Sequence, residues 1–136
     1  MHRNIVSPAA RAAIALGMMG LAACATQPQV RQPIEVQSVR LTGAGHYLDL
    51  RYRVLDPAAA QAALGPTVRP RLIDEVTGSA MAVPMTAKLG ALRQTQAVQK
   101  PDRTYFVMFV NSSGMRPGSK VTAELGELKF PHLTVE

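Results

Sequence analysis

Apolar and polar side chains alternate along His46–Val54 (HYLDLRYRV). On an extended chain one face carries Leu48, Leu50, Tyr52 and Val54, and the other carries Tyr47, Asp49, Arg51 and Arg53. This period of two predicts a half-buried β-strand. The preceding run, Ile34–Thr42 (IEVQSVRLT), is a second candidate strand and ends at Gly43-Ala44-Gly45. We therefore expect the two runs to pair as a hairpin.

A short helix is predicted after this hairpin. Asp56 can accept hydrogen bonds from the first free backbone amides of a helix, and Pro57 is preorganised for the first helical position. The helix continues through Ala58–Leu64, and Gly65-Pro66 ends it. Because two turns are marginal in isolation, the helix must pack on the rest of the domain, as a short crossover between strands.

The chain then returns to strand patterns. Val68–Asp74 (VRPRLID) predicts a strand, which we place at a sheet edge because Pro70 has no N–H to donate to a ladder. Residues 75–79 predict a tight turn, after which Ala80–Met85 returns as the partner strand. The pattern of Thr86–Gln99 is ambiguous and indicates a loop with a strand near Ala91–Thr95.

The most apolar run after the first 24 residues is Thr104–Val110 (TYFVMFV), and it is hydrophobic on both faces. This predicts a central strand that is buried on both sides. Lys120–Leu125 alternates, with Val121, Ala123 and Leu125 expected to point inward, and Gly126 predicts a bend before Glu127–Val135. About seven short strands and one short helix favour a mainly β fold, an antiparallel β-sandwich of immunoglobulin-like type, with a small closed β-barrel as the alternative.

The N-terminal segment has a different pattern. Arg3 and Arg11 supply positive charge before Ala12–Gly20, an uncharged and mostly apolar run that is too short to cross a bilayer as a helix. Leu21-Ala22-Ala23-Cys24 follows, and Cys24 is the one cysteine in the chain. This tetrapeptide resembles the bacterial lipobox. The resemblance implies that residues 1–23 are a signal peptide, that the Ala23–Cys24 bond is cut, and that Cys24 carries a diacylglycerol and an N-acyl chain.

Residues 24–33 are then expected to form a lipidated, flexible tether, and residues 34–136 a single domain. The segment Ala25–Pro33 lacks periodicity and contains two prolines and three glutamines. Two or three acyl chains anchor a protein stably to a membrane, whereas one does not. The same resemblance implies that Ala25 after the cysteine, in place of an Asp, favours the periplasmic face of the outer membrane over the inner membrane.

The net charge of the chain adds little to these expectations. The chain has 15 basic and 9 acidic residues, and removal of Arg3 and Arg11 with the signal leaves 13 basic residues. These charges are scattered rather than gathered in a stripe, so we expect no nucleic-acid binding. The segments Tyr52–Pro57, Leu72–Gly78 and Ala91–Thr95 resemble a group of small bacterial envelope proteins of unassigned function, which implies one intact domain.

The sequence offers few candidates for chemistry. It has no nucleophile elbow, no phosphate-binding glycine loop and no closely spaced histidines, so we do not expect an enzyme. Thioethers are soft ligands that suit copper(I). Met81, Met85, Met115 and His46 are therefore candidate copper ligands, although methionine also fills gaps in cores.

Our preferred interpretation is a non-enzymatic binding or scaffolding module, anchored by lipid, with another envelope protein as its partner. Sandwich domains often bind through an edge strand. The predicted edge Val68–Asp74, with Arg69 and Arg71 pointing outward, is the first candidate surface. Copper handling is the alternative, and an envelope enzyme is the third.

Overall fold

The computed structural model describes residues 31–94 and 99–136. The predicted signal peptide, Cys24 and residues 24–30 of the predicted tether lie outside the described residues, as does Thr95 of the predicted strand Ala91–Thr95. Among the described residues, no helix has the length and hydrophobicity needed to span a membrane.

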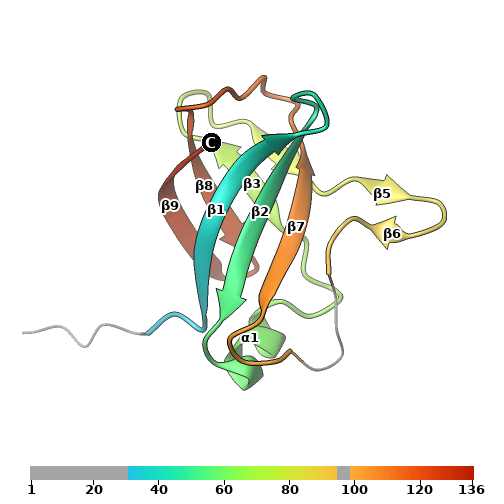
Figure 1. Ribbon diagram of the computed structural model, residues 1–136, viewed down its shortest axis with the longest axis vertical. Coiled ribbons are helices and arrows are strands. Elements are labelled where there is room, and N and C mark those ends of the chain that lie inside the picture. Colours follow the sequence, from blue (N-terminus) through green and yellow to red (C-terminus); the bar gives the residue numbers. More distant parts are fainter. Residues whose placement is uncertain (1–30, 95–98) are drawn as a thin grey trace, which may run out of the picture.

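Two antiparallel sheets form the body of the protein (Figure 1). The first sheet has the order β1-β2-β7 and contains β1 (Ile34–Thr42), β2 (Tyr47–Val54) and β7 (Thr104–Val110). The second sheet has the order β4-β3-β8-β9 and contains β3 (Arg71–Asp74), β4 (Ala80–Ala82), β8 (Lys120–Leu125) and β9 (Leu128–Thr134). This division of seven strands into three and four matches immunoglobulin-like sandwiches and excludes the closed barrel.

A third sheet, which is a two-stranded hairpin, projects from the side of the sandwich (Figure 1). Its strands are β5 (Met85–Thr86) and β6 (Gly90–Ala91), which pair antiparallel. The helix α1 (Pro57–Ala63) connects β2 to β3 and covers one end of the sandwich. As predicted, the Asp56 side chain caps this helix by accepting a hydrogen bond from the Ala59 amide (3.1 Å), and Pro57 occupies its first turn.

The alternation of the strands explains the core. The predicted inward face of β2 is buried along its whole length, and every second residue of β7 and β8 is buried as well. The core members from these three strands are Leu48, Leu50, Tyr52, Val54, Tyr105, Val107, Phe109, Val121, Ala123 and Leu125. The predicted hairpin of β1 and β2 is confirmed, with Ile34 opposite Val54 and Thr42 opposite Tyr47.

Two predictions about strand position are wrong. The segment Val68–Asp74 is not an edge strand: its strand begins only at Arg71, after Pro70, and β3 is paired on both sides, with β4 and with β8. Thr104–Val110 is not central, because β7 is the outer strand of its sheet and β2 is the middle one. Its second apolar face is half-buried through Phe106 and Met108.

Candidate functional site

A groove of about 840 Å³ lies beside the projecting hairpin. Residues 66–71 line one part of it, and several residues from Ala82 to Arg93, which include Met85 and Leu89, line the rest. We call it the hairpin groove. Its volume lies within the range of about 300–1,000 Å³ that is usual for ligand-binding clefts. It combines apolar side chains with three arginines.

The hairpin wall of the groove forms for local reasons. Pro84 follows β4 and supplies the carbonyl that accepts a hydrogen bond from the Leu92 amide (3.1 Å), which closes the base of the hairpin. At its tip, the Thr86 hydroxyl accepts from the Leu89 amide (3.0 Å) and donates to the Gly90 carbonyl (3.1 Å). Gly90 has a φ of +68°, which an L-residue seldom adopts. Met85 and Leu89 are left 72% and 77% exposed, and both line the groove.

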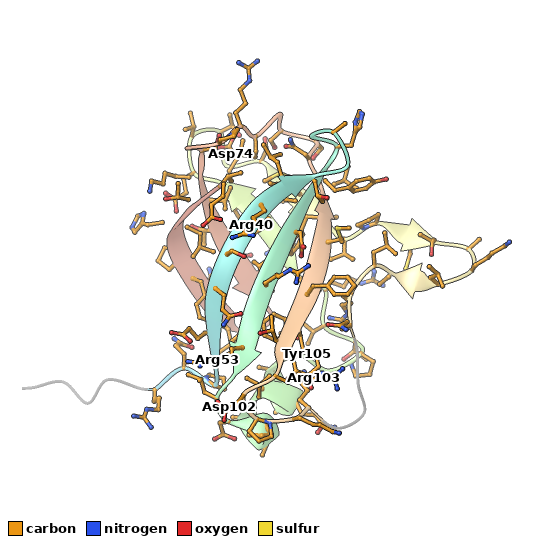
Figure 2. The ribbon with its side chains drawn as sticks, in the orientation of Figure 1. Arg40, Arg53, Asp74, Asp102, Arg103 and Tyr105 are labelled. Atoms are coloured by element: carbon orange, nitrogen blue, oxygen red, sulfur yellow. The ribbon has the colours of Figure 1, made fainter. Side chains whose placement is uncertain are left out.

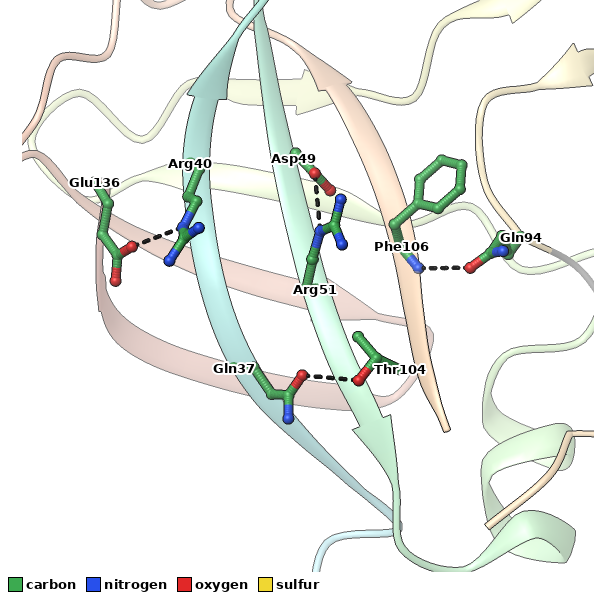
Figure 3. A network of polar contacts seen from close by, with 8 residues as sticks. All are labelled: Gln37, Arg40, Asp49, Arg51, Gln94, Thr104, Phe106 and Glu136. Carbon is green, nitrogen blue, oxygen red and sulfur yellow. Dashed lines mark hydrogen bonds and ion pairs between the residues drawn. The ribbon is translucent and has the colours of Figure 1, made fainter. Parts of the chain in front are cut away.

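The segment after the hairpin is fixed to the outer edge of β7. The Leu92 carbonyl accepts from the Met108 amide (2.9 Å), and the Gln94 amide donates to the Phe106 carbonyl (3.1 Å). The Gln94 side-chain Oε1 also accepts from the Phe106 amide at 3.2 Å (Figure 3). Arg93, which lies between these two anchors, pairs with Val107 in an isolated bridge. The backbone of Arg93 is therefore fixed on both sides, and its side chain lines the groove.

Arg93 is half-buried, and burial lowers its pKa, which the phenol of Tyr52 partly opposes. The guanidinium donates to the Gly65 carbonyl at 2.9 Å, which is a neutral acceptor. In the described part of the chain no carboxylate forms an ion pair with Arg93. A guanidinium carries five N–H donors, and the described residues account for the bond to Gly65 alone, so donors remain for an anion.

The other two arginines of the groove differ from each other. Arg71 forms an ion pair with Glu124 (2.5 Å), and Lys129 contacts the same carboxylate at 3.1 Å. Both contacts lower the pKa of Glu124, and the contact with Lys129 contributes most. Arg69 is exposed, and among residues 31–94 and 99–136 it has no ion pair. The groove therefore carries a surplus of positive charge.

The outer face of the three-stranded sheet provides a contrast (Figures 2 and 3). Each arginine on that face is close to a carboxylate: Arg40 to Glu136 at 2.8 Å, Arg51 to Asp49 at 3.0 Å and Arg53 to Glu35 at 2.8 Å. Positive charge is thus balanced on the flat face and left over in the hairpin groove.

An aromatic pair lies in the core at the same end as α1. The rings of Tyr52 and Tyr105 stack with centroids 5.8 Å apart, and the Arg103 guanidinium lies 5.8 Å from the Tyr105 ring centroid. Figure 2 shows Tyr105 and Arg103 near this end, with Asp74 at the opposite end. Burial raises the pKa of Tyr52 to about 12, and Arg93 acts in the opposite direction.

The predicted site residues divide into two groups. Arg69, Arg71 and Met85 all line the hairpin groove, although Met85 was assigned to copper and the arginines to a partner. Met81 is fully buried in β4 and Met115 is 8% exposed, so both are core residues. The expectation of one continuous strand Ala80–Met85, with Met81 and Met85 on the same face, is wrong because the strand stops after Ala82.

The structure does bring His46 and Met115 to one end of the sandwich, through Asn111. The Asn111 amide donates to the His46 carbonyl (2.9 Å), and its side chain exchanges hydrogen bonds with the Met115 backbone at 2.7 and 3.0 Å. Met85, in contrast, is on the projecting hairpin. Three or more His, Cys, Asp or Glu side chains do not gather in a metal-like group anywhere in the described residues.

The hairpin was not predicted from the sequence, and neither were Leu89 and Arg93 as groove residues. The available signal was Pro84, which cannot continue a ladder, followed six residues later by a glycine. Comparisons with protein-family models, with curated proteins and with solved structures found no match to this chain. The fold is therefore defined by its two antiparallel sheets alone, as a β-sandwich with a lateral hairpin.

Proposed function

We propose that this chain is the precursor of a lipid-anchored envelope protein whose β-sandwich binds a partner through the hairpin groove. In this proposal residues 1–23 direct secretion, Cys24 carries the lipid, and the module is not an enzyme. It acts at the periplasmic face of the outer membrane. The observation that carries the binding role is the groove, where exposed apolar side chains lie beside Arg69 and Arg93, which have no carboxylate partner among the described residues.

The free protein bears two energetic costs that binding of a partner would reduce. Exposed Met85 and Leu89 leave apolar surface in water, and the half-buried Arg93 lacks part of the hydration that an exposed guanidinium has. A partner that covers the apolar surface gains about 25 cal/mol per Å² of it, and an anionic group on that partner compensates the desolvated cation. The groove residues therefore gain more from association than those of the charge-balanced sheet face.

The anchor is tested by labelling cells with radioactive palmitate. We expect label in the wild-type protein and none in Cys24→Ala, which should accumulate as the uncleaved precursor. A Cys24→Ala protein of mature size in the membrane fraction would contradict the proposed anchor.

The binding role is tested by photo-crosslinking in intact cells. A benzophenone amino acid at position 69, in the groove, should give adducts with a protein. The same probe at position 116, an exposed arginine in the loop before β8, should not. A position-69 pattern of lipid and self-adducts alone would refute a protein partner at this surface.

A further inference from the structure

We infer that the hairpin groove takes an acidic, extended peptide segment of the partner, which pairs with the free edge of β4. This inference rests on the proposed binding function and specifies the chemistry of the partner. Three features of the described residues converge on it: an open backbone edge, unneutralised cations and exposed apolar side chains.

The edges of the two sheets are not equally covered. Segment 92–94 covers the outer edge of β7. The outer strands β1 and β9 meet through Val39 and Val135, and the Glu136 amide donates to the Val39 carbonyl at 2.9 Å. β4 is the remaining outer strand of the sandwich, and among residues 31–94 and 99–136 its one strand partner is β3. Unpaired backbone groups on such an edge are a template for another strand.

The register of β3 and β4 shows which backbone groups point outward. The Asp74 amide donates to the Ser79 carbonyl (2.9 Å), so these two residues form a hydrogen-bonded pair. In an antiparallel ladder such pairs alternate with non-bonded ones. Ile73 opposite Ala80 and Arg71 opposite Ala82 are then non-bonded pairs. The N–H and C=O groups of Ala80 and Ala82 consequently point to the free edge, and Ala82 also lines the groove.

The edge alone cannot hold a partner. β4 has three residues and Pro84 lies two residues beyond its end, so a peptide gains few backbone hydrogen bonds there. Side-chain contacts in the groove must supply the rest of the affinity. Arg69 and Arg93 can bind carboxylates through paired N–H donors, and Met85 and Leu89 can cover apolar side chains of the peptide.

An anionic lipid headgroup would use the arginines but not the backbone edge of Ala82. An acidic peptide uses both, along with the apolar rim. This difference favours the peptide and gives the experiment its two arms.

The probe is a blocked octapeptide of four Glu-Val repeats, titrated into the isotope-labelled full chain in neutral detergent micelles and followed by NMR. We expect the Ala82 amide to shift and to become protected from hydrogen exchange. A Gln-Val peptide of equal length should bind about tenfold more weakly, because it lacks the charge of the carboxylates. A Glu-Val peptide with N-methylated alternate amides should bind weakly as well. Equal binding of the Glu-Val and Gln-Val peptides would overturn the inference.

Variants of the chain separate the contributions. Ala82→Pro removes an outward N–H that makes no ladder bond, so the fold should persist, as a thermal unfolding curve will show, while peptide affinity falls about tenfold. Arg69→Gln should weaken binding about threefold, and Arg116→Gln, the control, should not change it. Retained affinity in a folded Ala82→Pro protein would refute edge pairing. The N-methylated peptide gives the same information without altering the fold.

The lipid arm adds phosphatidylglycerol to the micelles without peptide. The peptide inference would be overturned in favour of a headgroup site if phosphatidylglycerol shifts the NMR signals of groove residues and also displaces the bound peptide. Failure of the peptide to bind while position-69 protein crosslinks persist would refute the acidic segment and leave the proposed function standing. Loss of both results would refute the two together.

Discussion

Gly126 connects the fold to the wall of the hairpin groove, and its replacement by alanine tests that connection. It lies in the turn between β8 and β9 with a φ of +66°. A Cβ built there would be 2.6 Å from the Ala63 carbonyl oxygen, at the end of α1, and 3.3 Å from a methyl group of Val68. The nearer atom is backbone, so it cannot rotate away, and α1 or the β8–β9 turn must move.

The matched control is Gly114, whose φ of +67° is nearly the same but whose added Cβ would have no atom within 4 Å. Gly114→Ala therefore measures the backbone cost alone, about 1–2 kcal/mol for an L-residue in this conformation. Gly126→Ala adds an overpacking cost of about 1–3 kcal/mol. We expect it to lower the free energy of unfolding by about 2–5 kcal/mol in total, more than the control by the overpacking contribution.

The assay is urea unfolding of both variants and the wild type, followed by circular dichroism. Comparison of midpoints is valid if the slopes agree, since the slope reports the surface exposed on unfolding. In thermal unfolding each kcal/mol should correspond to about 4–8 °C for a domain near this size. Equal destabilisation by the two substitutions would refute the close approach of α1 to the β8–β9 turn. Because Val68 lines the groove, Gly126→Ala should also weaken binding of the Glu-Val peptide, whereas Gly114→Ala should leave it unchanged.

Three further predictions concern single side chains. Asp56→Ala should lower the free energy of unfolding by about 1 kcal/mol through loss of the helix cap, while Asp56→Asn retains it, as urea unfolding will show. Hydrogen bonds from the His132 amide (2.7 Å) and then the Thr122 hydroxyl lower the pKa of Glu75. Stability from Glu75 is thus present above its ordinary pKa of 4.5 and lost as pH falls through the lower folded value. Glu75→Gln should flatten this acid limb in a pH series of unfolding curves, and an unchanged limb would contradict it. Tyr52, with its pKa raised to about 12 by burial, should cause stability to fall between pH 10 and that value, and Tyr52→Phe should remove its share of the fall.

Local pattern predicted most elements of the fold. The period of two in His46–Val54 placed the same four side chains in the core that the structure buries, and Asp56-Pro57 marked the helix start within one residue. Both signals depend on the residues themselves and their immediate neighbours. The sandwich could also be predicted, because strand number and turn spacing are local properties as well.

Position within a sheet could not be predicted, because it depends on partners distant in the sequence. Pro70 is compatible with an inner strand because β3 starts one residue later. Thr104–Val110 is apolar on both faces yet forms an outer strand, since segment 92–94 covers its edge. The candidate site could be predicted only in part for the same reason. Arg69 and Arg71 were identified from their charge, but Arg93 reaches the groove through pairing with β7, which the local pattern does not show.

The segment from Pro84 to Gln94 explains why the free edge and the groove occur together. It leaves β4 after three residues, turns back through β5 and β6, and then pairs with β7. The same excursion that protects the edge of β7 thus ends β4 early and leaves its outward backbone groups unpaired. Because the path also places Met85, Leu89 and Arg93 beside that edge, an open strand acquires apolar and cationic contacts from its own continuation. The hairpin segment therefore supplies the side chains of the binding surface without an additional strand or helix in the sandwich. Shortening the hairpin should remove the groove and leave the two-sheet core intact.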